Sequence, residues 1–180
     1  MAHEIETKVL NINVDEIIEK LKSLSAEKTD ETRLSVTWYR PKGIKEGEDP
    51  WFLRIRSNSQ GVNTVTWKAK SDILGTARKH KEIDFRIEDK EKLSDLFEEL
   101  DLEIYAFQEK DRISFKLENW LIEIDQYPNM PAFLEIEGES EDHVNEAIAK
   151  LDLKENKTWA DGERILIQNT YGLDWYNMKF

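Results

Sequence analysis

Pairs of like charges two residues apart recur along the sequence. Acidic and basic pairs are kept separate: Glu4 and Glu6, Arg54 and Arg56, Lys68 and Lys70, Glu82 and Asp84, Lys110 and Arg112, Glu123 and Asp125, and Glu135 and Glu137. Successive side chains of a β-strand point to opposite faces, so each pair shares one face of its strand. Lysine and arginine bind phosphate oxygens, and clustered carboxylates bind hard divalent cations. The pattern therefore favours a site for a polyphosphate together with a metal ion.

An ordinary half-exposed sheet with a solvated polar face is the alternative interpretation of any one of these strands. Like charges about 6.7 Å apart repel by about 0.6 kcal/mol in water and by about 2.5 kcal/mol at an effective dielectric of 20. A purely structural face is expected to mix signs within a strand, because unlike neighbours attract. The sorting of acids with acids and bases with bases therefore favours two sub-sites for ligands of opposite charge.

Period-two alternation of apolar and polar residues predicts the strands that position these pairs. They are expected over Glu4–Leu10, Leu34–Arg40, Trp51–Arg56, Thr64–Lys70, Arg78–Ile87, Lys110–Leu117, Trp120–Asp125 and Phe133–Glu137. Apolar residues at helical spacing predict three helices, over Val14–Leu24, Lys90–Leu100 and Glu141–Leu151. The second helix is expected to bury Leu93, Leu96, Phe97 and Leu100. The stretch from Trp159 to Phe180 contains either a short strand at Ile165–Gln168 or a closing helix.

The strands have one apolar and one charged face, and three helices are available to cover apolar surface. These elements predict an α+β fold in which eight antiparallel strands close into a barrel with a charged lumen and flanking helices. The chain of 180 residues is expected to form a single domain over residues 1–180. The lumen is then expected to hold the cations Lys8, Arg54, Arg56, Lys68, Lys70, Lys110 and Arg112, and the anions Glu4, Glu6, Glu82, Asp84, Glu123, Asp125, Glu135 and Glu137.

Composition narrows the range of partners and compartments. The net charge of −12 disfavours general binding to nucleic acid. The sequence has no cysteine, which excludes disulfides and thiolate metal sites and favours a cytoplasmic location. No apolar run approaches the roughly 20 residues that span a bilayer, so no membrane partner is expected. The expected partner is a small molecule that contains a triphosphate, and a homodimer is left open as the assembly.

The motifs resemble those of a known family. Glu4-Ile-Glu6-Thr-Lys8 resembles the ExExK signature of the CYTH superfamily, the triphosphate tunnel metalloenzymes. The motifs that follow in the same order are Leu53-Arg54-Ile55-Arg56, Thr66-Trp67-Lys68-Ala69-Lys70, Glu82-Ile83-Asp84, Lys110-Asp111-Arg112, Asp125 and Phe133-Leu134-Glu135-Ile136-Glu137. The resemblance implies an eight-stranded antiparallel tunnel and an activity among the class IV adenylyl cyclases, thiamine triphosphatases and inorganic triphosphatases.

The resemblance also implies roles for individual residues. It implies that the metal ligands are Glu4, Glu6, Asp125, Glu135 and Glu137, with Glu82 and Asp84 matching the acidic pair of the middle strand. It implies that the phosphate binders are Lys8, Arg54, Arg56, Lys68, Lys70, Lys110 and Arg112. Lys8, Glu4 and Glu6 are the expected catalytic residues, and the implied metal is Mg²⁺ or Mn²⁺. The sequence departs from the family pattern at Tyr39-Arg40 and at Thr170-Tyr171-Gly172-Leu173, and a C-terminal Lys154 or Lys157 is a candidate to complete the site.

Three functions are compatible with these residues. The preferred one is metal-dependent hydrolysis of inorganic triphosphate or a related organic triphosphate, in which the metal orients a water molecule. In the second, the ribose 3′-hydroxyl of ATP is the nucleophile, and the products are cyclic AMP and pyrophosphate. The third is a module that binds polyphosphate without turnover. Phe52 shares a strand face with Arg54 and Arg56, so it either contacts an organic group at the tunnel mouth or merely fills the lumen.

Overall fold

One sheet of eleven strands dominates the computed structural model, which describes residues 3–180 except residues 46 and 71, and except the side chains of residues 3, 4 and 74. The strands are β1 (His3–Val9), β2 (Glu27–Pro41), β3 (Trp51–Asn58), β4 (Asn63–Ala69), β5 (Asp72–Leu74), β6 (Ala77–Ile87), β7 (Leu102–Leu117), β8 (Trp120–Gln126), β9 (Phe133–Gly138), β10 (Thr158–Trp159) and β11 (Asn177–Met178). The helices are α1 (Val14–Ser23), α2 (Lys90–Glu99), α3 (Glu141–Lys150), α4 (Glu163–Ile165) and the π-helix η1 (Leu166–Thr170).

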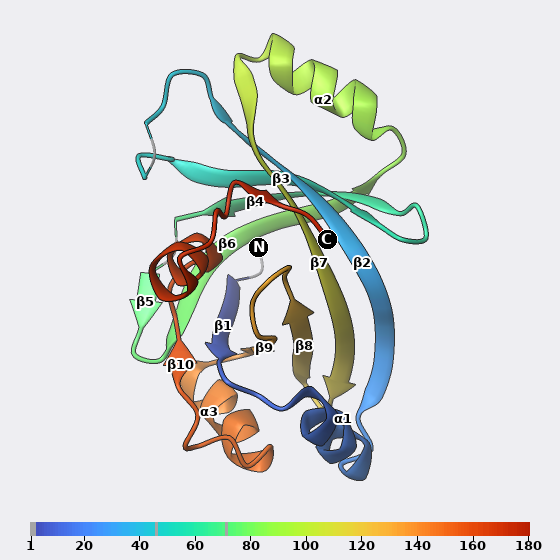
Figure 1. Cartoon of the computed structure of the whole chain (residues 1–180), viewed down its shortest axis with the longest axis vertical. Helices are drawn as coiled ribbons and strands as arrows, with labels where there is room; N and C mark the ends of the chain where they lie inside the picture. Colours follow the sequence, from blue (N-terminus) through green and yellow to red (C-terminus); the bar gives the residue numbers. More distant parts are fainter. Residues whose placement is uncertain (1–2, 46, 71) are drawn as a thin grey trace.

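The predicted barrel is confirmed. The strands follow the order β1-β9-β8-β7-β2-β3-β4-β6, and β6 pairs again with β1, which closes a ring of eight antiparallel strands. β2 and β7 are the longest strands, and they pair along their length with irregularities between Lys28 and Asp30 and between Trp38 and Tyr39. Figure 1 shows these two strands curving along one side of the molecule. Closure supplies every ring strand with a partner on both sides.

Side-chain caps fix where the three long helices begin. The side chain of Asn13 accepts hydrogen bonds from the backbone N–H groups of Asp15 and Glu16 at the start of α1. Asp89 caps α2 and Ser140 caps α3 in the same way. These contacts satisfy N–H groups that have no partner within the helix. The predicted helix boundaries agree with the structure to within one residue.

Helices α1 and α3 cover the barrel at one end, and α2 lies near the other (Figure 1). α1 and α3 pack their apolar faces, with Ile17, Leu21, Val144 and Ile148, against the outer faces of β7, β8 and β9. Burial of a large aliphatic side chain stabilises the fold by roughly 1.5–3 kcal/mol, so this cluster is a main source of stability. Within the described part of the chain, no helix is long and apolar enough to cross a membrane.

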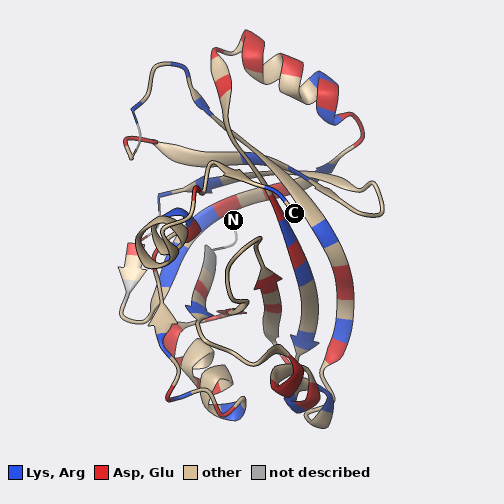
Figure 2. Ribbon diagram, viewed as in Figure 1, with Lys and Arg blue, Asp and Glu red and all other residues tan. Residues whose placement is uncertain are grey.

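The prediction for α2 is wrong in part. Leu93 and Phe97 pack on the outer sheet face around Tyr39, whereas Leu96 and Leu100 are 51% and 61% exposed. On the outer face of β6, Ile83 and Phe85 are also exposed rather than covered by a helix. One helix is too narrow to cover the whole apolar outer face of the adjoining strands. Figure 2 shows α2 carrying acidic residues along much of its length.

Candidate functional site

The cross-strand register places charged side chains in rows on the inner face of the barrel. Trp38 on β2 stands opposite Arg54 on β3, and Arg54 stands opposite Thr66 on β4. Phe52 pairs with Lys68, and Lys68 pairs with Glu82 on β6. On the other side of the ring, Arg112 pairs with Asp125, and Lys8 pairs with Glu135. The period-two pattern of the sequence therefore becomes a continuous charged interior.

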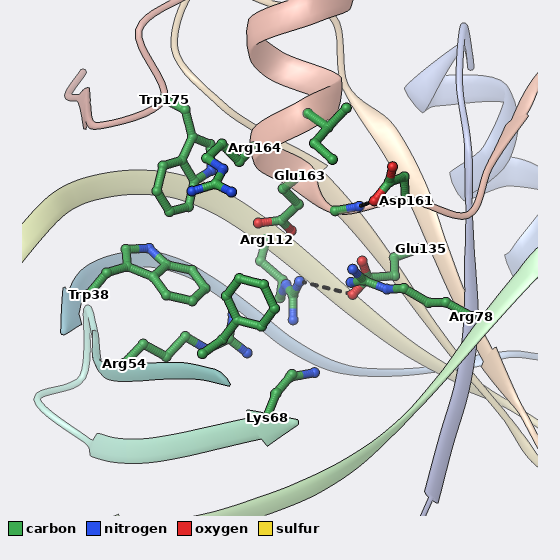
Figure 3. A pocket seen from close by; sticks show the side chains of 13 residues that line it. Trp38, Arg54, Lys68, Arg78, Arg112, Glu135, Asp161, Glu163, Arg164 and Trp175 are labelled. Atoms are coloured by element: carbon green, nitrogen blue, oxygen red, sulfur yellow. Dashed lines mark hydrogen bonds and ion pairs between the residues drawn. The ribbon is translucent and has the colours of Figure 1, made fainter. Parts of the chain in front are cut away.

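A cavity opens into this interior (Figure 3). Five basic side chains line it: Arg54, Lys68, Arg78, Arg112 and Arg164. Three carboxylates, Glu135, Asp161 and Glu163, also line it. Three aromatic side chains, Trp38, Phe52 and Trp175, line it as well. The cavity thus joins a cationic compartment to an aromatic one.

Arg54 differs from the other cavity cations in its contacts. Its Nε atom is buried and has no hydrogen-bond partner among the described residues, and its guanidinium lies 5.3 Å from the ring centre of Trp38. The neighbouring Arg56 is bound to Asp84, with 3.2 Å between Nη2 and Oδ1. The positive charge of Arg54, together with burial and the charge of Arg112, lowers the pKa of Arg56 to about 10. Crowded cations of this kind favour an anionic ligand.

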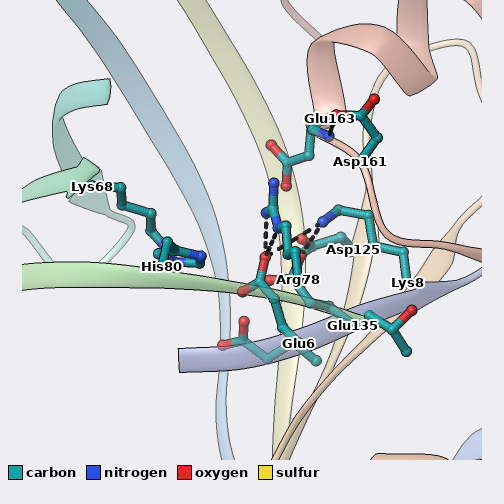
Figure 4. Close-up of polar contacts among 12 residues, drawn as sticks. Glu6, Lys8, Lys68, Arg78, His80, Asp125, Glu135, Asp161 and Glu163 are labelled. Atoms are coloured by element: carbon teal, nitrogen blue, oxygen red, sulfur yellow. Dashed lines mark hydrogen bonds and ion pairs between the residues drawn. The ribbon is translucent and has the colours of Figure 1, made fainter. Parts of the chain in front are cut away.

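Lys8, Glu6 and Glu135 form a buried cluster where β1 meets β9 (Figure 4). The Nζ atom of Lys8, whose side chain is 1% exposed, lies 2.8 Å from Glu135 Oε2 and 3.7 Å from Glu6 Oε1. Arg78 Nε donates to Glu6 Oε1 at 2.6 Å. Burial and Glu135 push the pKa of Glu6 upward, but Arg78, Lys68 and Lys8 outweigh them, so this pKa lies below its usual value. Glu6 is therefore ionised at neutral pH.

Lys110 and Arg112 meet at Asp125, which is fully buried. Lys110 Nζ donates to Asp125 Oδ2 at 2.8 Å, and Arg112 donates to both carboxylate oxygens at 2.6 Å. Arg112 also pairs with Glu123 and lies 3.7 Å from Glu135. The charges of Asp125 and Glu123 overcome the effect of burial and hold the pKa of Arg112 well above its usual value.

The middle strands carry the remaining predicted pairs. Glu82 pairs with Lys68 and lies 3.6 Å from His80 Nε2, while Asp84 accepts from Thr66 Oγ1 at 2.5 Å. Lys70 follows the end of β4 and is exposed. Glu137, on β9 beside Glu6, is partly buried. The Glu4 side chain lies outside the described residues.

The structure therefore brings most of the predicted residues together, but not every one. The interior is shared by Lys8, Glu6, Glu82, Arg54, Arg56, Lys68, Lys110, Arg112, Glu123, Asp125 and Glu135, whereas Lys70 and Asp84 are exposed. Among the described side chains, no three carboxylates or histidines are grouped closely enough to hold one metal ion. Glu6 and Glu135 nevertheless offer oxygen donors on neighbouring strands, and their mutual repulsion is the feature that a hard divalent cation relieves.

The C-terminal residues of the site were missed by the sequence analysis. Lys154 and Lys157 are exposed, and Lys157 lies over the Trp159 ring. The C-terminal residues that line the cavity include Trp175 and also Glu163 and Arg164, both carried by the closing helix α4. Arg164 Nη1 donates to the buried Asp49 at 3.1 Å. The sequence contains only a weak indication of these elements, because a three-residue helix and a π-helix show no recognisable periodicity of apolar residues.

Comparison with known proteins agrees with this architecture. The sequence model of the CYTH domain matches residues 2–163. The chain superimposes on PH1819 from Pyrococcus horikoshii with a TM-score of 0.71 and 23% identity, covering 93% of this chain and 99% of that one. No curated protein sequence matches the chain.

Two further solved structures carry functional descriptions. One is a putative adenylate cyclase from Vibrio parahaemolyticus, with a TM-score of 0.67, 15% identity and coverage of 98% of this chain and 92% of that one. The other is a putative adenylyl cyclase from Hippeastrum described as having a dominant triphosphatase activity, with a TM-score of 0.69, 11% identity and coverage of 94% and 96%. At these identities the likeness establishes the fold.

Proposed function

The chain belongs to the CYTH domain family, and on that premise we propose that it hydrolyses inorganic triphosphate or a related organic triphosphate with the help of a divalent metal ion. In this reaction a water oxygen bonds to the terminal phosphorus while the bridging P–O bond breaks. The products of inorganic triphosphate are orthophosphate and pyrophosphate, and the proton of the water passes to solvent. The preference for hydrolysis over mere binding rests on the retained carboxylates, which anion binding alone does not need.

The observation that carries the proposal is the surplus of cationic charge around Arg54. In a protein with a net charge of −12, Arg54 is partly buried, its buried Nε has no hydrogen-bond partner among the described residues, and its charge depresses the pKa of Arg56. A linear triphosphate supplies several negative charges in a row, and planar guanidinium groups bind phosphate oxygens in pairs. The proposed phosphate binders are Lys8, Arg54, Arg56, Lys68, Lys110 and Arg112, with Lys70 at the edge of the site.

The metal ion is proposed to be Mg²⁺ or Mn²⁺, held by oxygen donors on β1 and β9. The proposed ligands are Glu4, Glu6, Glu135 and Glu137, with Asp125, Glu82 and Asp84 as further acidic groups. A divalent ion held by these carboxylates would supply positive charge that offsets the negative charge developing in phosphoryl transfer. Lys8 contacts both Glu6 and Glu135, so it is positioned to hold the terminal phosphate beside these carboxylates.

An organic triphosphate is favoured over the inorganic ion by the aromatic side of the cavity. Trp38, Phe52 and Trp175 offer ring faces beside the cationic compartment, and flat organic groups stack on such faces. The same feature supports the second candidate, a class IV-type adenylyl cyclase. There the ribose 3′-oxygen bonds to the α-phosphorus of ATP and pyrophosphate leaves. A non-catalytic polyphosphate-binding module is the third candidate.

Product analysis separates these candidates. The purified protein is incubated with tripolyphosphate, ATP or thiamine triphosphate, each with Mg²⁺, Mn²⁺ or EDTA. Orthophosphate from any of the three supports hydrolysis, cyclic AMP from ATP supports the cyclase, and binding without any product supports the third candidate. Glu6→Gln is expected to weaken the metal dependence and Arg56→Ala the substrate affinity. Full activity in either variant contradicts the role proposed for that residue.

A further inference from the structure

Glu163 is a largely buried carboxylate, with a side chain that is 11% exposed, and it was not among the expected site residues. It is the first residue of helix α4, and its side chain extends toward the cationic interior (Figures 3 and 4). Lys110 Nζ donates to Glu163 Oε1 at 3.2 Å, and the hydroxyl of Tyr127 donates to Glu163 Oε2 at 2.7 Å. Both oxygens of the carboxylate are therefore bound by side chains of the barrel wall.

The carboxylate is charged in this setting. Burial tends to raise the pKa of Glu163, but the positive charges of Lys110 and Lys8 outweigh it, so the pKa lies well below its ordinary value. Lys110 already has a carboxylate partner, because Asp125 accepts from it at 2.8 Å. Asp125 is shared with Arg112, so Glu163 is the second carboxylate that balances the charge of Lys110.

The attachment of Glu163 differs from that of the other site carboxylates. Glu6, Asp125 and Glu135 stand on strands of the closed ring, where backbone pairing on both sides fixes them. Glu163 stands on a three-residue helix whose N-cap, Gly162, provides no side-chain hydrogen bond. The next residues, Leu166 and Ile167, are fully buried and anchor the segment from behind. The segment is therefore anchored by Leu166 and Ile167, whereas the Glu163 carboxylate is held by the side chains of Lys110 and Tyr127.

We propose that Glu163 is an internal competitor of the substrate, and that a triphosphate displaces its carboxylate from Lys110 and Tyr127 on binding. This inference rests on the proposed function, since it assigns Lys110 to the triphosphate. Glu163 partly neutralises the cationic interior through its contact with Lys110. Glu163 also sets a minimum charge for a ligand, because only a ligand with more negative charge than one carboxylate competes effectively for Lys110.

The test is the affinity for tripolyphosphate in EDTA, measured by isothermal titration calorimetry. Glu163→Gln keeps the shape of the side chain but removes the competing charge, so its dissociation constant is expected to fall roughly tenfold or more, the scale of a hydrogen bond to a charged group. Glu155→Gln, at an exposed position, changes the net charge equally and is expected to leave the affinity unchanged.

A double-mutant cycle with Tyr127 separates competition from a merely structural role. Tyr127→Phe removes the hydrogen bond that holds Glu163 in place, so this change is expected to tighten tripolyphosphate binding in the wild-type background. In the Glu163→Gln background the same change is expected to give a much smaller gain, because the competing anion is already gone. Thermal unfolding of each variant checks that the fold is retained.

The outcomes distinguish this inference from the proposed function. If the wild type binds tripolyphosphate and Glu163→Gln binds it equally or more weakly, the displacement model is wrong. Weaker binding of Glu163→Gln in Mg²⁺, with no change in EDTA, also overturns the model and makes Glu163 a metal ligand. If neither protein binds tripolyphosphate under any condition, the proposed function itself fails.

Discussion

The guanidinium of Arg112 and the carboxylate of Asp125 form a doubly hydrogen-bonded pair inside the barrel, with both bonds 2.6 Å long. Arg33 and Asp111 form the same pair on the surface, with bonds of 2.7 and 2.8 Å. The side chains of the inner pair are 10% and 0% exposed, whereas those of the outer pair are 46% and 44% exposed. The chain therefore contains a matched comparison of one interaction in two environments.

Asp125→Asn is expected to destabilise the protein far more than Asp111→Asn. Breaking a buried pair leaves Lys110 and Arg112 without their shared carboxylate, at a cost of roughly 3–5 kcal/mol. Water compensates the exposed Arg33, so the outer change is expected to cost only a small fraction of that. Urea unfolding followed by tryptophan fluorescence measures both. Equal losses in the two variants contradict the assignment of Asp125 as the anchor of the inner cations.

Arg54→Gln is expected to weaken triphosphate binding without lowering the stability of the fold. Arg54 has no carboxylate partner among the described residues and repels Arg56, so its removal is expected to leave the free energy of unfolding unchanged or slightly higher. The affinity for tripolyphosphate is expected to fall at least tenfold, because a charge-assisted contact is lost. Arg33→Gln on the surface is the control. A variant that unfolds more easily but binds normally would make Arg54 a structural residue.

Acid is expected to destabilise the fold through the interior carboxylates. Burial acts to raise the pKa values of Glu135 and Glu163, but neighbouring cations reverse this and hold both below the ordinary 4.5. A carboxylate with a lowered pKa in the folded state stabilises the protein above about pH 4.5, and this contribution is lost as the pH falls further. Glu123, whose pKa burial raises, acts in the opposite direction.

Urea unfolding between pH 7 and pH 3 measures this effect. The wild type is expected to lose stability as the pH falls below about 4.5, and Glu163→Gln to lose less over the same interval. The difference in the free energy of unfolding between the two proteins should thus be largest near neutral pH. If the free energy of unfolding changes with pH by the same amount in both proteins, Glu163 is not an ionised carboxylate bound by Lys110.

Phe52→Leu is expected to change substrate preference without changing phosphate binding. Phe52 lines the aromatic side of the cavity and is only partly buried, so leucine retains much of the packing while the ring face is lost. Affinity for ATP or thiamine triphosphate is expected to fall several-fold, whereas that for tripolyphosphate stays constant. An equal loss for all three ligands indicates that Phe52 shapes the phosphate site rather than an organic sub-site.

The barrel and its charged interior could be predicted from the sequence because both depend on period-two patterns. Most of the like-charge pairs alternate with apolar residues, as Arg54 and Arg56 do with Leu53 and Ile55, and this alternation determines which face of the strand turns inward. The starts of the helices could also be predicted from the sequence, because Asn13 and Ser140 are residue types that cap helices. These features are local, so the sequence contains them in full.

The features that were missed depend on tertiary contacts. The first half of β2, from Glu27 to Arg33, lacks apolar alternation and forms a strand because β7 pairs with it. The exposure of Leu96 follows from the width of the sheet under α2, which helical spacing does not encode. Glu163 lies 53 residues from Lys110, and only closure of the C-terminal segment brings the two together.

Titration of the wild-type protein with tripolyphosphate in Mg²⁺, followed by calorimetry, tests the central claim most directly. The cationic interior is predicted to bind one triphosphate per chain, and the Arg54→Gln/Arg56→Ala double variant to lose that binding while remaining folded. Absence of binding by the wild type, or undiminished binding by a folded double variant, would contradict the claim that these side chains form a triphosphate site.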